Sequence, residues 1–584
     1  MGKVLRYLNR RQIFQSLCCF ACIIATVWLN LKMPDYMSTI TTLVETPKSQ
    51  MSDILTQGAW MLACAVGAGI SMVLANYLAS LVSAGLAKTL RQEMYQKTIH
   101  MAMQDVDRYS ADSLINRTTN DITQIQNFIG MGMSFMFMSP IMAGWAIVKI
   151  LGKAWQWTAA TACSLLLITA VLTVGLIVAM PRFKKIQSLN DNLNQVTREQ
   201  LTGIRVVRAY NAEKYQHKKF SKANDELTDN NMTAFHVMSI FNPSVQFINS
   251  LLPLMIYLLG ASLITTAGSK QKLGIFSNMV VFSSYAMQIV MSFMMLSMIV
   301  FLWPRASVSS QRVSEVLETP DSMADGKDTD SSEHGSIEFK HVSFKYPETA
   351  SEVLKDISFK IAPGSTFAII GATGSGKSSL LNLIVRFYDA TGGQVLVDGK
   401  NVKDYRRSSL RGRIGYATQK AILFKGTVKS NISFGQSDRV KSPEDLQKAI
   451  DLAQASDFVS QMPGKEDAAI AQGGTNVSGG QKQRLSVARA IARKPEILLF
   501  DDTFSALDYQ TDRMLRQALS KELKKSTKVI VAQRISTIRD ADQILVLDHG
   551  QAVGLGKHAD LLKTCPTYQE IVASQLSKEE LSHA

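Results

Sequence analysis

The stretch TFAIIGATGSGKSSLLNLIV, residues 366–385, decides the fold of the C-terminal half of this chain. An apolar run typical of a buried strand leads into a glycine-rich loop, and the loop leads into an apolar helical run. The loop matches the pattern G-x-x-x-x-G-K-S, whose backbone N–H groups can surround phosphate oxygens at a helix N-terminus. This context of strand, loop and helix predicts a phosphate-binding loop (P-loop) for a nucleotide.

The residue types in the loop have separate predicted roles. The glycines allow the backbone to approach the phosphates, Lys377 neutralises charge on the β- and γ-phosphates, and Ser378 supplies a hydroxyl for Mg²⁺. The predicted nucleotide-binding residues of the loop are Gly371, Gly374, Ser375, Gly376, Lys377, Ser378 and Ser379.

Short β-branched or aromatic runs such as RIGYAT, EILLFDD and KVIVAQ alternate with helical segments around this loop. The alternation predicts an α/β domain with a largely parallel sheet. EILLFDD at 496–502 ends in two carboxylates, of which Asp501 fits a Mg²⁺-binding acid and Asp502 the residue that orients the attacking water. VSGGQKQR at 477–484 predicts another helix start suited to an anion, although an ordinary helix cap has the same pattern.

The N-terminal half differs in composition, because it contains long windows without Asp, Glu, Lys or Arg. Each window reaches the roughly 20 residues that an α-helix needs to cross a bilayer. We therefore predict six membrane helices, and no acidic side chain within these windows could anchor a cationic cargo. The windows are 12–31, 54–87, 122–148, 154–181, 230–269 and 273–304.

The basic excess of the chain first suggests a nucleic-acid partner, since 63 Lys and Arg stand against 48 Asp and Glu in 584 residues. Residues 1–315 alone hold 27 of the basic residues and 15 of the acidic ones. If the N-terminus is cytoplasmic, 21 of those basic residues lie inside and six outside, as the positive-inside rule predicts. The charge therefore reports orientation in the cytoplasmic membrane, and a nucleic-acid partner is not expected.

These patterns predict a multi-domain membrane protein. An all-α transmembrane domain of six helices (1–315) is expected to precede an acidic, Ser/Asp-rich linker (316–335) and an α/β P-loop nucleotide-binding domain (336–584). The segments 88–121 and 182–229 are too long for turns and carry helical patterning, so we expect the membrane helices to continue as cytoplasmic arms. The N-terminus and the nucleotide-binding domain are predicted to be cytoplasmic.

With these motifs in order, the chain resembles one half of an ATP-binding cassette exporter, in which six membrane helices are fused to one nucleotide-binding domain. Tyr346 in HVSFKYP resembles the aromatic that stacks on adenine, and Gln419 in YATQKAILFKGTV resembles the glutamine that links Mg²⁺ to the membrane domain. VSGGQ resembles the family signature LSGGQ, and SALD at 505–508 resembles the loop that crosses between two ATP sites.

The resemblance implies ATP and Mg²⁺ as ligands and two cassettes that close head-to-tail over two ATP molecules. Each site then combines one chain's P-loop with the other chain's signature, and the arm tips at Asp105–Leu114 and Arg208–Phe220 dock on the nucleotide domains. Further nucleotide-binding residues implied in this way are Tyr346, Ser478, Gly479, Gly480, Gln481 and Asp508, and the implied Mg²⁺ ligands are Ser378, Gln419 and Asp501.

The resemblance implies three catalytic residues, Asp502, Gln533 and Gln419. The chain departs from the family pattern at two of them, Asp502 and Gln533. The family usually has Glu where Asp502 stands, a switch His in place of Gln533, and often a Glu where Gln472 precedes the signature. An aspartate carboxylate would fall roughly 1.5 Å short of the water, and a misplacement of ~1 Å can cost about 10²-fold in rate. Gln533 can hydrogen-bond but does not titrate.

We interpret the two substitutions as evidence that the ATP site on this chain's P-loop is weakly hydrolytic and that the chain forms a heterodimer. This pattern is similar to that of bacterial heterodimeric multidrug exporters. The partner would be a half-transporter subunit with the catalytic Glu and switch His intact, and this chain's signature would complete the partner's ATP site. The alternative is a slow, symmetric homodimer.

The cargo is expected to be a hydrophobic or amphipathic small molecule, because the sixth window contains the methionine-rich run MQIVMSFMMLSMIV. Met287, Met291, Met294, Met295 and Met298 fall near helical spacing, and methionine adapts to varied apolar surfaces. Helix packing or contact with membrane lipid explains the same run. A lipid or lipid-linked flippase and an ATP-gated channel or sensor remain alternatives to a small-molecule exporter.

Overall fold

The computed structural model describes residues 1–46, 49–151, 153–266, 268–331, 333–347, 349, 351–435 and 442–575. The chain divides into two compact units. The first is Met1–Ile99 together with Asp112–Thr319, and the second is His100–Ala111 together with Pro320–Ala584. A short helical segment from the first half of the chain therefore belongs with the nucleotide-binding domain.

All regular secondary structure in the described residues of the first unit is helical. Six stretches are long and apolar enough to cross a membrane: Arg10–Val44, Met51–His100, Ala111–Ile150, Trp155–Gly175, Pro243–Thr266 and Gln271–Leu296. The prediction of six membrane helices is thereby confirmed. The elements are α1 (Gly2–Leu5), α2 (Arg10–Glu45), α3 (Met51–His100), α5 (Ala111–Asn116), a π-helical turn (Arg117–Asp121), α6 (Ile122–Ile150), α7 (Trp155–Thr202), α8 (Ile204–Ala209), α9 (Glu213–Thr266) and α10 (Ser269–Glu318).

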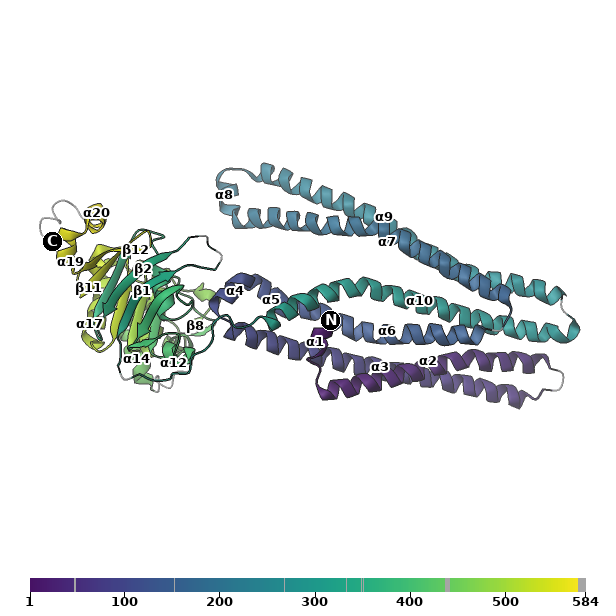
Figure 1. Ribbon diagram of the computed structural model, residues 1–584. Coiled ribbons are helices and arrows are strands. Elements are labelled where there is room, and N and C mark those ends of the chain that lie inside the picture. The colour runs from purple at the N-terminus through teal and green to yellow at the C-terminus, as the bar shows by residue number, and fades with distance from the viewer. Residues whose placement is uncertain are drawn as a thin grey trace. The chain divides into compact units, whose positions relative to one another are not determined.

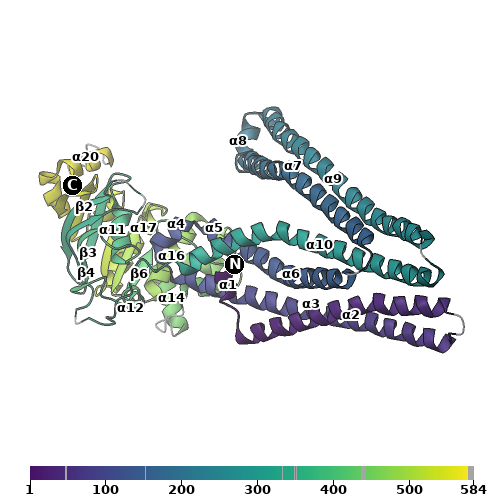
Figure 2. The ribbon, with the colours of Figure 1, turned by 45° about the vertical axis from the view of Figure 1, so that its right-hand side comes forward.

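Several of these helices are about 50 residues long, well beyond the roughly 20 that a bilayer requires. Figures 1 and 2 show α7 and α9 running side by side with α8 at the turn between them, while α6 lies along α10. At the end of the arm formed by α7, α8 and α9, Tyr210 is 80% exposed and Val206 is 60% exposed. The arm therefore ends in exposed apolar side chains.

α2 extends past the charge-free window predicted for it and thereby includes an acidic residue, Asp35. The Asp35 carboxylate lies 2.6 Å from Lys149 Nζ on α6 and accepts a 2.7 Å hydrogen bond from the Tyr285 hydroxyl on α10. The same hydroxyl lies 3.0 Å from the carbonyl oxygen of Leu31. A charged group in a spanning helix is expensive unless it is paired, and Asp35 is paired across three helices.

The second unit is built on a six-stranded sheet in the order β12-β11-β3-β10-β9-β6. All neighbours in it are parallel except the antiparallel pair β11 and β12. A four-stranded antiparallel sheet, β2-β1-β4-β5, and the short pair β7-β8 complete the strands. The strands are β1 (Ile337–Phe344), β2 (Leu354–Ile361), β3 (Thr366–Gly371), β4 (Gly392–Val397), β5 (Lys400–Asn401), β6 (Ile414–Ala417), β7 (Gly426–Thr427), β8 (Ala469–Ile470), β9 (Ile497–Asp501), β10 (Thr527–Val531), β11 (Gln543–Asp548) and β12 (Gln551–Gly556).

The helices of this unit surround the sheets, as both ribbon views show (Figure 1, Figure 2). They are α4 (Met103–Tyr109), α11 (Lys377–Ile384), α12 (Arg407–Gly412), α13 (Val428–Ile432), α14 (Pro443–Leu452), α15 (Ser456–Gln461), α16 (Gly479–Ala492), α17 (Tyr509–Glu522), α18 (Ile535–Ile538), α19 (His558–Thr564) and α20 (Pro566–Gln575). Two 3₁₀ turns, Lys465–Asp467 and Gln472–Gly474, lie before α16.

The central sheet separates two hydrophobic cores. Along β3, Phe367 and Ile369 pack into one core while Ala368 and Ile370 pack into the other. Because both faces of a mostly parallel sheet are buried, its strands are continuous apolar runs rather than alternating ones. The predicted α/β domain with a largely parallel sheet is therefore confirmed, and the carboxyl ends of β3 and β9 lead directly into the predicted site.

Of the acidic segment expected to be a linker, residues 316–318 still belong to α10, whereas the described residues from 320 onward lie against the nucleotide-binding domain. Asp321 pairs with Arg407 at 2.7 Å and Asp328 pairs with Lys400 at 3.0 Å. Asp330 pairs with Arg413, whose guanidinium also contacts the buried Asp398 at 3.1 Å. Burial raises the pKa of Asp398, although the backbone N–H groups of residues 335 and 336 stabilise its charge. Composition indicated the polarity of this segment but not the basic residues that hold it.

We expect Arg413→Met to destabilise the cassette by about 3–5 kcal/mol, because it leaves Asp398 buried without its cation. Lys400→Met is the matched control, since both partners of the Lys400–Asp328 pair are about 40% exposed and such pairs contribute at most about 1 kcal/mol. Proteolysis of the cassette in increasing urea, with the full chain, measures both costs. Equal costs for the two substitutions would contradict this account of Arg413.

Candidate nucleotide site

The P-loop connects β3 to α11 and is shaped for phosphate. Gly376 caps α11 with φ of 98°, and a Cβ there would lie 2.7 Å from a Leu354 methyl carbon, so only glycine fits without strain. The Ser375 hydroxyl is buried and lacks a hydrogen-bond partner among the described residues. A buried hydroxyl and a helix N-terminus in one loop suit a ligand with several phosphate oxygens.

Lys377 lies inside this loop rather than extending into solvent. Its Nζ donates hydrogen bonds to the carbonyl oxygens of Gly371 at 2.9 Å and Ala372 at 2.7 Å. Burial lowers the pKa of Lys377, and the negative charges of Asp502 and Asp501 oppose that shift. The cation is thus held at the mouth of the loop, where phosphate charge would replace the two carbonyl contacts.

Ser378 and Asp501 come together as the sequence predicts for a divalent cation. Ser378 Oγ donates to Asp501 Oδ1 at 2.9 Å, and the Tyr416 hydroxyl lies 3.4 Å from Asp501 Oδ2. Burial raises the pKa of Asp501, against the stabilising effect of those two hydroxyls. A hydroxyl beside a buried carboxylate is an oxygen donor set that fits Mg²⁺.

The three predicted catalytic residues meet at the Asp502 carboxylate. Gln533 Nε2 donates to Asp502 Oδ2 at 3.1 Å, and the Gln419 side chain helps to stabilise the negative charge of Asp502. Asp502 has φ of 46°, a left-handed backbone that aspartate tolerates better than most residues. Burial raises the pKa of Asp502, and the neighbouring Ser505 side chain, the Lys377 charge and the Gln419 side chain oppose the shift.

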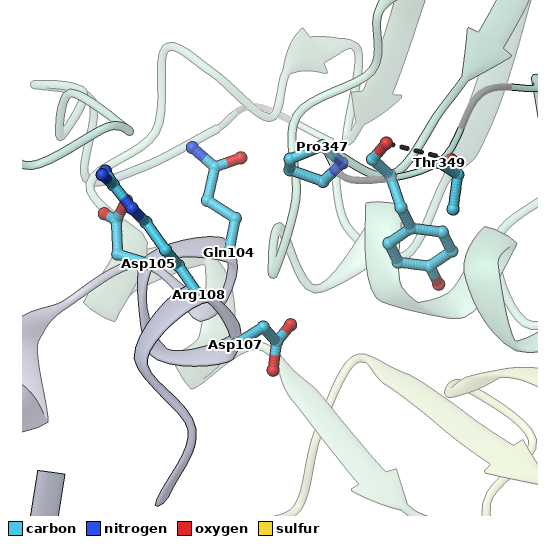
Figure 3. Close-up of a pocket in the computed structure, with 7 residues that line it drawn as sticks. Gln104, Asp105, Asp107, Arg108, Pro347 and Thr349 are labelled. Carbon is cyan, nitrogen blue, oxygen red and sulfur yellow. Dashed lines mark hydrogen bonds between the residues drawn. The ribbon is translucent and has the colours of Figure 1, made fainter. Parts of the chain in front are cut away.

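Tyr346, predicted to stack on adenine, lies close to the P-loop helix. Its hydroxyl is 3.0 Å from the Ser379 hydroxyl, and its ring packs edge-on against the Tyr388 ring at 5.1 Å between centroids. The ring borders a pocket of about 580 Å³ whose other wall is α4 (Figure 3). Figure 3 shows that one side of the pocket is formed by α4, which carries Gln104, Asp105, Asp107 and Arg108. Pro347 and Thr349 lie on the opposite side.

Hydrogen bonds to Tyr388 and Ser322 join α4 to the cassette, and neither residue lies in a sequence motif. The Tyr388 hydroxyl donates to Asp107, and Asp105 Oδ2 accepts hydrogen bonds from the backbone N–H and the hydroxyl of Ser322, the latter at 2.7 Å. The predicted arm tip at Asp105–Leu114 thus begins in a helix that packs on the nucleotide domain. Sequence reasoning missed Tyr388, which lies in no motif, and Tyr416, which begins the run quoted for Gln419 but has no role of its own in the motif.

The signature residues form the start of α16. Ser478 Oγ accepts from the backbone N–H of Gln481 at 3.3 Å, while Gln481 Oε1 accepts from the backbone N–H of Ser478 at 2.9 Å. This capping box leaves the N-terminus at Gly479 and Gly480 formed and available to an anion. Asp508 likewise caps α17 by accepting from the backbone N–H of Thr511, and this hydrogen bond lowers the pKa of Asp508.

Comparison with known proteins agrees with this architecture. Residues 16–293 match the family model of the ABC transporter transmembrane region, and residues 354–505 match that of the ABC transporter ATP-binding domain. An uncharacterized ABC transporter ATP-binding protein of Mycobacterium tuberculosis is 37% identical over 543 residues, which cover 90% of each chain. An ATP-dependent lipid A-core flippase of Pseudomonas fluorescens is 32% identical over 516 residues, covering 87% of this chain and 84% of that protein.

Among solved structures, a bacterial Atm1-family ABC exporter with ATP bound shares the fold with a TM-score of 0.76. It is 23% identical, and the match covers 97% of this chain and 100% of that one. Six apolar helices precede a P-loop domain in one chain, so the protein is a multi-pass membrane protein with a cytoplasmic ATP-binding domain and ATPase activity coupled to transport. The chain belongs to the ABC transporters and is a half-transporter of the exporter type.

Proposed function

We propose that this chain is one half of a heterodimeric exporter of hydrophobic or amphipathic compounds, and that its own P-loop site hydrolyses ATP weakly. The observation that carries this proposal is the 3.1 Å hydrogen bond from Gln533 Nε2 to Asp502 Oδ2. A carboxylate oxygen that already accepts an amide hydrogen bond is a poorer acceptor for the proton of an attacking water. The two catalytic positions that depart from the family pattern thus hydrogen-bond to each other.

Side-chain length supports the same conclusion. Asp502 is one methylene shorter than glutamate, which places its carboxylate roughly 1.5 Å from the position of a glutamate carboxylate, and ~1 Å already costs about 10²-fold in rate. Gln533 donates a hydrogen bond without carrying charge, so it stabilises the developing charge on the transferred phosphate less than a protonated histidine would. The P-loop still binds the phosphates, and the Gln533 amide can add an uncharged hydrogen bond to the γ-phosphate, which favours binding of ATP over ADP.

The preformed signature indicates where this chain contributes to hydrolysis. The capped N-terminus of α16 would complete an ATP site on the P-loop of a partner that has Glu and His at the positions of Asp502 and Gln533. The exposed arm end around Tyr210 offers an apolar surface for docking on that partner. These features support a heterodimer with one strong and one weak ATP site.

The proposed cycle is alternating access. ATP binding closes the two cassettes, draws the cytoplasmic arms together and turns the cavity outward, and hydrolysis at the partner's P-loop site resets the transporter. In this chain, Lys377 and Ser375 bind phosphate oxygens, and Ser378, Asp501 and Gln419 would hold Mg²⁺. The bound cation would neutralise charge on the β- and γ-phosphates.

The membrane unit favours apolar or amphipathic cargo. Asp35 offers no free carboxylate to a cationic compound, because Lys149 and Tyr285 occupy its oxygens. Met291 and Met298 on α10 are 44% and 48% exposed and provide a flexible apolar surface. Lipid translocation is the second candidate, because the lipid A-core flippases are 30–32% identical to this chain.

Vesicles containing this chain and a second half-transporter with the catalytic Glu and the switch His would test the proposal. We expect ATP-dependent movement of a hydrophobic dye, little movement of a fluorescent phospholipid, and loss of dye movement with Gly480→Asp in this chain. Movement of the phospholipid without the dye would assign the protein to lipid translocation. Full activity of this chain purified alone as a homodimer would overturn the heterodimer.

A further inference from the structure

The segment between β10 and α18, residues 532–534, carries Gln533 and is held from several sides. Gln533 Nε2 donates to Asp502 Oδ2, and Arg534 Nη2 donates to the carbonyl oxygen of Ser505 at 3.3 Å. The backbone N–H of Ala532 donates to the carbonyl oxygen of Ile369 at 3.2 Å. These contacts link the segment to Asp502 directly after β9, to Ser505 in the loop that follows, and to Ile369 in β3.

A further contact to this segment comes from the last residue of α20. Gln575 Nε2 donates to the carbonyl oxygen of Gln533 at 2.7 Å, and Gln575 Oε1 accepts from the backbone N–H of Ile535 at 2.9 Å. One side-chain amide thus satisfies an acceptor and a donor two residues apart, as a neighbouring peptide group would. Two simultaneous hydrogen bonds fix both the position and the orientation of the backbone that carries the Gln533 side chain.

Gln575 itself is exposed, but the helix that presents it is anchored. Tyr568 and Val572 on α20 are fully buried in the core of the cassette, and the Tyr568 hydroxyl lies 2.7 Å from Nδ1 of the buried His558 on α19. The amide of Gln575 therefore extends from a fixed support.

We infer that Gln575 is a positioning residue for ATP recognition, which holds the Gln533 side chain where it can face the γ-phosphate. This inference rests on the proposed role of Gln533 at this chain's own ATP site. The ATP site is then stabilised from the C-terminal end of the domain, 42 residues along the chain from Gln533. ADP lacks the γ-phosphate, so its binding should not depend on Gln575.

Photolabelling with an azido-ATP tests this inference in membranes that contain the full chain and its partner, with this chain isolated through an affinity tag. Competition by ATP and by ADP gives the preference of this chain's site for ATP. We expect Gln575→Ala to lower that preference roughly tenfold, the factor that about 1.4 kcal/mol represents, with ADP competition unchanged. Gln575→Glu keeps the acceptor but loses the donor, and we expect it to lower the preference as well.

Gln569→Ala is the matched control, because Gln569 lies on the same helix and its Nε2 also donates to a backbone carbonyl, that of Leu562, at 2.7 Å. We expect this control to keep the wild-type preference. An unchanged preference in both Gln575 variants, while Gln533→Ala loses it, would overturn the positioning role alone. An unchanged preference in Gln533→Ala would instead show that the proposed role of Gln533 is wrong. Equal weakening of ATP and ADP would mean that Gln575 is merely structural.

Discussion

Gly480→Asp in this chain is expected to lower the ATPase activity of the assembled transporter by about 10²–10³-fold, the loss typical of removing one preorganised contact to transition-state charge. Gly480 lies in the first turn of α16, where the capped helix end would meet the phosphates of ATP bound to the partner's P-loop. A carboxylate there would repel the γ-phosphate. A Cβ added at Gly480 would have its nearest neighbour, the carbonyl oxygen of Ala506, at 3.3 Å, so a side chain needs only a small adjustment.

The fold should tolerate this substitution, because a negative charge in the first turn is favourable for the helix itself. Ala559→Asp is the matched control, since Ala559 is an exposed residue in the first turn of α19 and the change in charge is the same. We expect the control to retain nearly full ATPase activity. If Gly480→Asp retained more than half of the wild-type activity, the signature of this chain could not be completing the main hydrolytic site.

Asp502→Glu combined with Gln533→His is expected to raise hydrolysis at this chain's own site by about 10²-fold. The longer carboxylate would reach the water, and removing Gln533 would free the oxygen that now accepts its amide hydrogen bond at 3.1 Å. The measurement requires a partner whose catalytic Glu is replaced by Gln, so that hydrolysis arises at this chain. Asp502→Glu alone should give a smaller gain, because Gln533 would still compete for the carboxylate.

Lys377→Ala added to that double substitution is the control, since it removes the cation held inside the P-loop by the carbonyls of Gly371 and Ala372. The gained activity should then disappear. The wild-type chain beside the disabled partner could instead hydrolyse ATP as fast as the transporter with an intact partner. In that case, the substitutions at Asp502 and Gln533 would not reduce hydrolysis.

Short sequence patterns predicted those parts of the site that are formed by residues close together in the sequence. The strand, loop and helix around Lys377, the acid at the end of β9 and the capped start of α16 each rest on short-range spacing, and the structure contains them at those positions. Charge-free windows likewise predicted six membrane helices, because crossing a bilayer sets a minimum apolar length.

Contacts between distant segments could not be predicted in this way. Tyr388 and Asp107 are 281 residues apart, and Gln575 and Gln533 are 42 apart, so no periodicity records either pair. The charge-free window 12–31 also stops short of Asp35, although the helix itself continues to residue 45. The ion pair with Lys149 compensates the Asp35 charge within this longer helix, which only the three-dimensional packing of α2, α6 and α10 reveals.

The measurement that tests the central claim most directly follows the γ-phosphate at each chain during turnover. The assembled transporter would be supplied with azido-ATP radiolabelled on the γ-phosphate, crosslinked by light at successive times, and separated into its two chains. We predict that this chain retains the γ-label long after the partner has lost it. Loss of the γ-label from both chains at the same rate would contradict the account, because the site built on Asp502 and Gln533 would then hydrolyse ATP as fast as its neighbour.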